Sequence, residues 1–110
     1  MNRLVLFFLF LLELVGLRPR RYRVLRVEEM VDNPKRFQLY AIGGDSPWLA
    51  NMLCPCGCGD LIQLSLLERD SPSWRLTVDE SNLPTLSPSV WRSKGCRSHF
   101  FVRDGSIVWC

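Results

Sequence analysis

The chain has 110 residues, of which 47% are hydrophobic, and a formal net charge of +3. This length supports a single domain with a modest core, which a bound structural metal would supplement. The charge is uneven, because residues 1–26 carry six arginines and one glutamate, a net charge of +5, and the rest of the chain carries −2. This slightly acidic body lacks a basic stripe with aromatic platforms, which argues against nucleic-acid binding.

The first expected element is an apolar helix over residues 4–17, which reads LVLFFLFLLELVGL and which Pro19 should close. Its length of about 21 Å is short for a bilayer core of about 30 Å. Arginines follow at positions 18–26 in place of a small-residue cleavage site, and such a basic flank favours the cytoplasmic side. We therefore expect residues 1–18 to anchor a cytoplasmic protein to the inner face of the membrane. Packing against a partner or the core, and a cleaved signal peptide, are the alternatives.

Beyond the helix, the pattern changes to short alternating runs that are typical of β-strands. Asp104-Gly105 is the clearest hairpin turn, and Pro88 must lie at a sheet edge or a bulge because it has no N–H to donate. We expect an all-β domain over residues 21–110, a small antiparallel sheet or sandwich of about seven short strands. The runs that predict strands are 22–27, 37–42, 48–53, 61–67, 74–79, 85–91, 99–103 and 106–109.

A cysteine cluster, CPCGCG, separates the third and fourth runs and should form the tip of a hairpin. Cysteines at alternate positions strain a disulfide, whereas thiolates that converge from a glycine-rich turn suit tetrahedral zinc. A disulfide pair with free thiols and inert buried cysteines are the alternatives. The odd cysteine count, with Cys110 left over, suits a reducing compartment. We therefore predict a zinc-stabilised domain with a structural Zn²⁺ on Cys54, Cys56, Cys58 and Cys96.

His99 is the only histidine, and it lies three residues after Cys96. It is either a general base near neutral pH or a ligand that completes the tetrahedron with three cysteines. A base needs a nucleophile within hydrogen-bond reach. Ser89 is the first candidate, because Pro88 can fix an exposed bend beside it. Ser98 is the second and requires a bulge, since neighbouring strand residues point to opposite faces. Alternatively, these serines only fill turn and surface positions.

Three phrases, CPCGCG, TLSPSVW and GCRSHFFVRDGSIVWC, occur in this order. Together they resemble domain-of-unknown-function family 6527, small bacterial proteins associated with operons for ubiquitin-like conjugation. The resemblance covers residues 22–110. It implies an unusual serine protease that processes or removes a ubiquitin-like protein. It also implies metal-type positions at Cys54, Cys56, Cys58 and Cys96, and catalytic-type positions at Ser89, Ser98 and His99.

Two classes of function follow from these observations. The first is a serine-type peptidase or hydrolase whose partner is a ubiquitin-like protein or its conjugates, with Asp79, Glu80 or Asp104 orienting His99. The alternative is a non-catalytic zinc-binding module that recruits a conjugation-pathway partner to the membrane, with His99 bound to metal or buried. A zinc hydrolase with an open coordination position is a third possibility, but the sequence offers no evident carboxylate base near His99.

Overall fold

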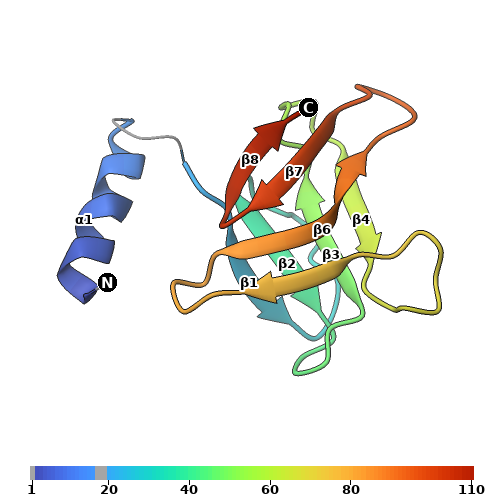
Figure 1. The fold of residues 1–110 in the computed structure, drawn as a ribbon, viewed down its shortest axis with the longest axis horizontal. Coiled ribbons are helices and arrows are strands. Elements are labelled where there is room, and N and C mark those ends of the chain that lie inside the picture. Colours follow the sequence, from blue (N-terminus) through green and yellow to red (C-terminus); the bar gives the residue numbers. More distant parts are fainter. Residues whose placement is uncertain (1, 17–19) are drawn as a thin grey trace.

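The computed structural model describes residues 2–16 and 20–110, which form one helix followed by eight short strands. The first four strands form one sheet in chain order and the last four form a second, and the two sheets lie face to face (Figure 1). The expected all-β domain is thus a sandwich, and each of the eight predicted runs overlaps one of its eight strands. The strands are β1 (Arg23–Val27), β2 (Gln38–Ile42), β3 (Leu49–Leu53), β4 (Leu61–Ser65), β5 (Arg75–Val78), β6 (Pro84–Trp91), β7 (His99–Arg103) and β8 (Ser106–Trp109).

The hydrophobic core lies between the two sheets. Alternation along each strand sends every second side chain inward, and burial of a Leu or Phe side chain contributes about 1.5–3 kcal/mol. The first sheet supplies Leu39 and Met52, and the second supplies Leu86, Phe100 and Val102, all nearly inaccessible to solvent. Because these residues fix the inner face of the second sheet, the residues between them face outward.

The expectation of an antiparallel sheet is wrong for β1 and β2, which pair in parallel, whereas the remaining strand pairs are antiparallel. A parallel pair needs a connection that carries the chain back to the starting end of the first strand. Residues 28–37 make this return. The Asp32-Asn33-Pro34 turn signal in this connection marks a bend but does not reveal the direction in which the next strand runs.

The second sheet ends in the hairpin that the sequence predicts most clearly. Asp104 and Gly105 connect β7 to β8 and have φ angles of 48° and 77°. Two successive residues in the left-handed region are what a two-residue hairpin turn requires. Arg103 and Ser106 face each other directly across this turn.

Helix α1 (Arg3–Leu14) lies to one side of the sandwich (Figure 1). Asn2 caps it by accepting a hydrogen bond from the N–H of Val5 (2.8 Å). Most of its apolar side chains are exposed, whereas Glu13 is buried and accepts hydrogen bonds from Arg23. The helix is shorter than expected, and Leu17 and Pro19, which were expected to end it, lie outside the described residues. No helix in the described part of the chain is both long and apolar enough to cross a bilayer.

We predict that a chain without residues 1–17 still folds into the sandwich. The strands begin after this segment, and Glu13 is the only buried residue of the helix. Loss of its ion pair with Arg23 (3.0 Å) should lower the melting temperature by only a few degrees. Circular dichroism melting of both chains checks this, with Glu13→Gln in the full chain as the matched control. An unfolded truncated chain would instead make the helix part of the core. Co-sedimentation of the two chains with anionic vesicles tests the expected membrane anchoring.

Candidate active site and metal centre

Three of the clustered cysteines lie on the short loop between β3 and β4. The backbone of Cys54 closes this loop: its N–H donates to the carbonyl of Asp60 (2.9 Å) and its carbonyl accepts from the N–H of Gly57 (3.1 Å). Gly57 and Gly59 have φ angles of 89° and 86°, in the left-handed region that strains other residues. These glycines allow a tight loop in which the thiols of Cys54 and Cys56 contact each other. The cluster therefore lies at the tip of a hairpin, as predicted.

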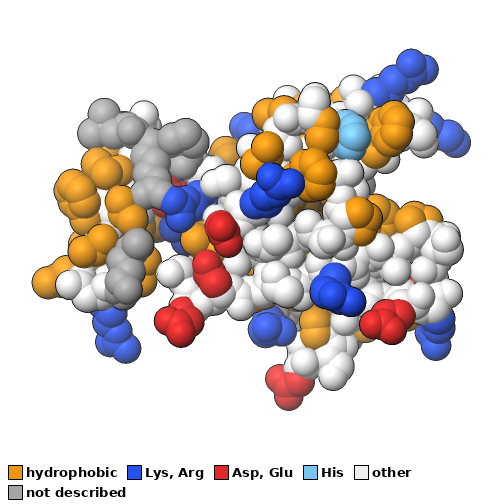
Figure 2. All heavy atoms as spheres, viewed as in Figure 1, with side chains coloured by type: hydrophobic (Ala, Val, Ile, Leu, Met, Phe, Trp, Pro, Cys, Tyr) orange, Lys and Arg blue, Asp and Glu red, His pale blue; other side chains and the backbone are white. Residues whose placement is uncertain are grey.

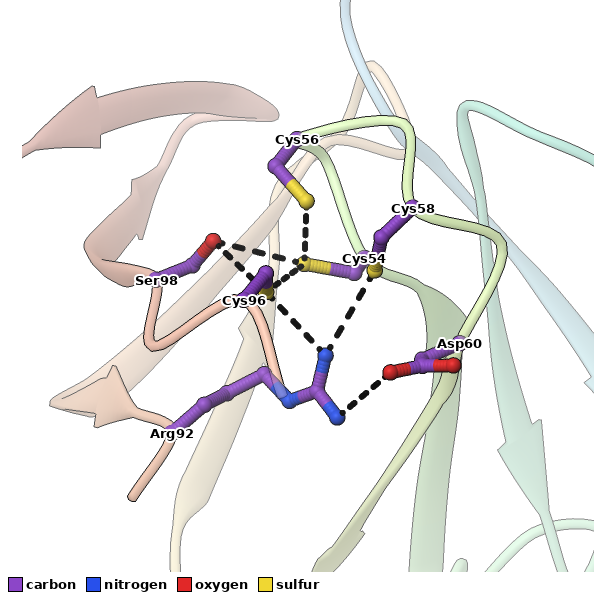
Figure 3. A network of polar contacts seen from close by, with 7 residues as sticks. All are labelled: Cys54, Cys56, Cys58, Asp60, Arg92, Cys96 and Ser98. Carbon is purple, nitrogen blue, oxygen red and sulfur yellow. Dashed lines mark hydrogen bonds and ion pairs between the residues drawn. The ribbon is translucent and has the colours of Figure 1, made fainter. Parts of the chain in front are cut away.

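The fourth cysteine, Cys96, comes from the loop between β6 and β7. Its Sγ lies 3.5 Å from the Sγ of Cys54, which lies 3.4 Å from that of Cys56. With Cys58 included, the four Sγ atoms all lie within 4.8 Å of one another. Figure 3 shows the four cysteine side chains gathered at one place, from two different loops. Four sulfurs bound tetrahedrally to zinc at about 2.3 Å would lie about 3.8 Å apart. The four thiols therefore fit a metal ion.

Neither a disulfide pair nor inert core packing suits these cysteines as well as a metal does. All five cysteines, each in the described part of the chain, are free thiols. Only Cys54 is buried, whereas Cys56, Cys58 and Cys96 are exposed. Inert cysteines that merely fill the core would be buried as a group. A shared ligand for the four thiols accounts both for their convergence and for their position at the surface.

Arg92 lies against the thiol cluster (Figure 3). Its Nη1 donates to the Sγ of Cys96 (3.2 Å) and, at 3.6 Å, to that of Cys58, and its Nη2 donates to the Oδ2 of Asp60 (3.1 Å). The hydrogen bond to Asp60, followed by those to the thiols, raises the pKa of the Arg92 guanidinium. Four thiolates around a divalent cation carry a net charge of −2, which a neighbouring arginine partly offsets.

Ser98 is buried against the same cluster. Its Oγ lies 3.1 Å from the Sγ of Cys96 and 3.6 Å from that of Cys54. Hydrogen bonds from the side chain and backbone of Ser98 lower the pKa of Cys96 to about 6. A backbone hydrogen bond from Asp60 lowers the pKa of Cys58, but desolvation and the neighbouring thiols outweigh it and raise the pKa to about 11. The hydrogen bonds from Ser98 therefore favour the thiolate form of Cys96, which is the form that binds metal.

A second constellation lies on the neighbouring strands β6 and β7. The Oγ of Ser89 lies 2.9 Å from the Nε2 of His99. Between Leu86 and Val90, β6 holds two residues more than the facing part of β7, so the register shifts there. Pro88 lies inside this irregular stretch, which confirms that it occupies a bulge. The bulge places Ser89 within reach of a histidine on the next strand.

Ser89 and His99 lie on the outward face of the second sheet. Val90 and Phe100, which pair with each other, point into the core, so the residues beside them point out. Trp91 pairs with His99, and their rings stack with centroids 4.8 Å apart and planes 9° apart. Figure 2 shows the histidine at the surface between hydrophobic side chains. A hydroxyl hydrogen-bonded to an accessible imidazole can act as a nucleophile with its general base.

The other candidate residues lie elsewhere. Ser98 faces the thiols, on the side opposite to the His99 ring, and the stretch around it has no bulge that would reverse this. Asp79 accepts hydrogen bonds within the turn between β5 and β6, which also contains Glu80. Asp104 follows the last residue of β7, whereas His99 is its first, a separation of more than about 13 Å. These three carboxylates thus lie at the far end of the sheet from His99.

Sequence reasoning missed two residues of these sites, Arg92 and Trp91. Each depends on a contact between segments that are distant in the chain or on the register of a strand pair. The stacking of Trp91 on His99 follows once the pairing of β6 with β7 is known. The position of Arg92, four residues before Cys96, was the one sequence signal that it would face the thiols.

Comparison with models of known protein families identifies a family that this chain matches. The model of the family described as bacterial ubiquitination-like system serine protease (BubE) matches residues 26–110. The matched region contains all four clustered cysteines together with Ser89, Ser98 and His99. The family match agrees with the expected association with a ubiquitin-like system. The description of the family does not confirm the family number 6527. No curated protein and no solved structure matches the chain.

Proposed function

The chain belongs to the family of bacterial ubiquitination-like system serine proteases, and from this premise we propose that Ser89 and His99 are its catalytic pair. The observation that carries the proposal is the contact of 2.9 Å between the Oγ of Ser89 and the Nε2 of His99. The proposed reaction is hydrolysis at the C-terminal tail of a ubiquitin-like protein, which processes the protein or releases it from a conjugate.

In the proposed mechanism, His99 is neutral and its Nε2 accepts the proton of the Ser89 hydroxyl. The Oγ of Ser89 attacks the carbonyl carbon of the scissile bond and forms a tetrahedral intermediate. When the intermediate collapses, the bond to the leaving group breaks, and the protonated His99 gives its proton to that group. Water, deprotonated by the same Nε2, then hydrolyses the acyl-enzyme and regenerates Ser89.

The imidazole needs a fixed orientation for both proton transfers. In many serine hydrolases a carboxylate supplies it. Here the candidate carboxylates lie at the far end of the sheet, whereas the indole of Trp91 stacks on the ring of His99. The backbone of His99 is also fixed, because its carbonyl accepts the N–H of Cys110 (3.0 Å). We propose that Trp91 is the positioning residue and that Ser89 and His99 act as a dyad.

We also propose that the metal is zinc and that its role is structural. Cys54, Cys56, Cys58 and Cys96 would fill all four positions of a tetrahedron, the arrangement of closed structural zinc sites. Such an ion ties the loop between β3 and β4 to the loop between β6 and β7. His99 is not among the clustered ligands and its Nε2 contacts Ser89, so it is assigned to the base rather than to the metal.

Labelling with a fluorophosphonate tests the proposed nucleophile. We expect the wild-type chain to form one covalent adduct, located on Ser89 by peptide mass spectrometry, because its hydroxyl is activated by His99. His99→Ala should react much more slowly and retain its zinc. An adduct on Ser98 would move the nucleophile there. If no serine were labelled and the ubiquitin-like protein bound without being cleaved, the non-catalytic zinc-binding module would be the better description.

A further inference from the structure

Strand β6 extends beyond its neighbour β5, and past the indole of Trp74 at Ser89 it leaves an open edge at Trp91. Arg75, the first residue of β5, pairs with Ser87. From there β6 continues to Trp91 with β7 on one side only, as the ribbon in Figure 1 shows. Open strand edges present unpaired backbone groups to any extended chain that approaches them.

The backbone of Trp91 faces this open edge. In an antiparallel pair, residues with hydrogen bonds to the partner strand alternate with residues whose N–H and C=O point away. The N–H of Arg92 donates to the carbonyl of Ser98 (2.9 Å) in the loop joining the two strands, so the next pair, Trp91 and His99, is of the second kind. The carbonyl of His99 confirms this, because it accepts from Cys110 on the opposite side. Both polar backbone groups of Trp91 therefore point toward the place where a further strand would lie.

The same edge is partly occupied at Ser89. The indole Nε1 of Trp74 donates to the carbonyl of Ser89 (3.2 Å), which shows that this carbonyl also faces the open side. Trp74 thus supplies a hydrogen bond to the backbone carbonyl of Ser89, while the hydroxyl of Ser89 contacts His99. Trp91 is the next residue of β6 whose backbone groups point to the open edge. There an incoming chain finds both a free N–H donor and a free C=O acceptor.

Two hollows flank this stretch of β6. A cavity of about 470 Å³ lies at one end and includes Trp74 and Ser87 in its lining. A second, of about 480 Å³, lies at the other end and is lined by Trp91, Arg92, Ser93 and Arg97. The path along β6 from Ser87 to Trp91 is shorter than four extended residues, because the bulge puts two more residues here than in the facing part of β7. Ser89 lies midway, so a short extended peptide would have side-chain space on both sides of the nucleophile.

We infer that an extended substrate segment adds to β6 as a short strand, with its backbone hydrogen-bonded to the N–H and C=O of Trp91 and its scissile carbonyl beside Ser89. This inference rests on the proposed function and specifies the substrate as an extended, unstructured tail. A helical segment cannot add to a strand edge in this way, because its backbone groups are hydrogen-bonded within the helix. Affinity then comes from the main chain, and the two cavities select the side chains.

The test measures binding of a ten-residue peptide from the C-terminal tail of the ubiquitin-like protein of the same system to Ser89→Ala, which cannot consume it. A series of peptides, each with one N-methylated amide, is compared with the parent. Methylation of the residue opposite Trp91 should weaken binding about tenfold, because a hydrogen bond is lost. Methylation of the residue on either side should have little effect, since those amides point away from β6.

A pair of variants tests the protein side of the same bond. Trp91→Ala and Trp91→Pro, each also carrying Ser89→Ala, both lose the indole, but only the proline loses the N–H. The proline variant should bind the parent peptide about tenfold more weakly than the alanine variant, with equal zinc content. If the proline variant fails to fold, the peptide series still decides.

The possible results separate the inference from the proposed function. If wild type cleaves the parent peptide but the methylated series shows no alternating pattern, the edge-docking inference falls and the proposed function stands. If the pattern appears with Ser89→Ala but wild type cleaves nothing, docking stands and the proposed function falls. Absence of measurable binding at about 1 mM peptide also overturns the inference.

Discussion

Replacement of Ser89 by alanine is expected to lower kcat/KM for cleavage of a ubiquitin-like tail by roughly 10⁴-fold or more. The substitution removes the proposed attacking atom, and within residues 2–16 and 20–110 no other hydroxyl hydrogen-bonds to the His99 ring. His99→Ala should have an effect of similar size, because the Ser89 hydroxyl is then left without a base. Steady-state kinetics with a tail fused to a fluorescent leaving group measures both variants.

The double variant distinguishes a functional pair from two separate contributions. Ser89→Ala with His99→Ala should be little worse than either single change, because the two groups act as a unit. Ser98→Ala, assayed at saturating zinc, should retain cleavage within a few-fold, and Ser106→Ala serves as an exposed control on the same sheet. Loss of cleavage in Ser98→Ala, with Ser89→Ala close to wild type, would refute the assignment of Ser89.

Cys54→Ser and Cys58→Ser are each expected to abolish zinc binding and to lower the melting temperature by about 10 °C or more. A zinc ion bound to the four cysteines would close a loop of 37 residues between Cys58 and Cys96. By analogy with a disulfide, closing a loop of this length contributes about 4 kcal/mol, and 1 kcal/mol corresponds to about 4–8 °C in a domain of this size. Metal analysis and thermal melting are the measurements.

Cys110→Ser is the matched control for these changes, because Cys110 is an exposed cysteine outside the cluster. It should keep the metal and the melting temperature of wild type. A chelator should reproduce the effect of Cys54→Ser on the wild-type protein. If metal-free and metal-loaded wild type melted at the same temperature, the structural role of the metal would be refuted.

The sequence predicts the strands of this fold better than it predicts their arrangement. Alternating apolar residues place each strand within a few positions, because the pattern directly reflects which side chains face the core. The Asp104-Gly105 hairpin is equally local. The parallel pairing of β1 with β2 is not, because it depends on the path of the connection between them, and no local pattern encodes that path.

The candidate sites show the same limit. The cysteine cluster is visible in the sequence because three ligands share one loop. The contact between Ser89 and His99 depends on a register shift of two residues in β6, for which Pro88 is the only sequence signal. The sequence does not distinguish the surroundings of Ser89 and Ser98, whereas the structure places Ser89 against His99 and Ser98 against the thiols. The stacking of Trp91 on His99 and the contacts of Arg92 with the thiols could likewise not be predicted from the sequence alone.

The four thiols come from both halves of the sandwich, three from the loop between β3 and β4 and one from the loop that joins β6 to β7. The second loop also connects the strand of Ser89 to the strand of His99. Removal of the metal should therefore disturb the catalytic geometry without any metal having touched the substrate. In an inhibitor survey, inhibition by a chelator would make this protein look like a metalloprotease. Two observations would identify a serine protease instead. Inactivation by the chelator would be slow and would parallel unfolding, and Ser89 would be covalently modified in the metal-loaded protein.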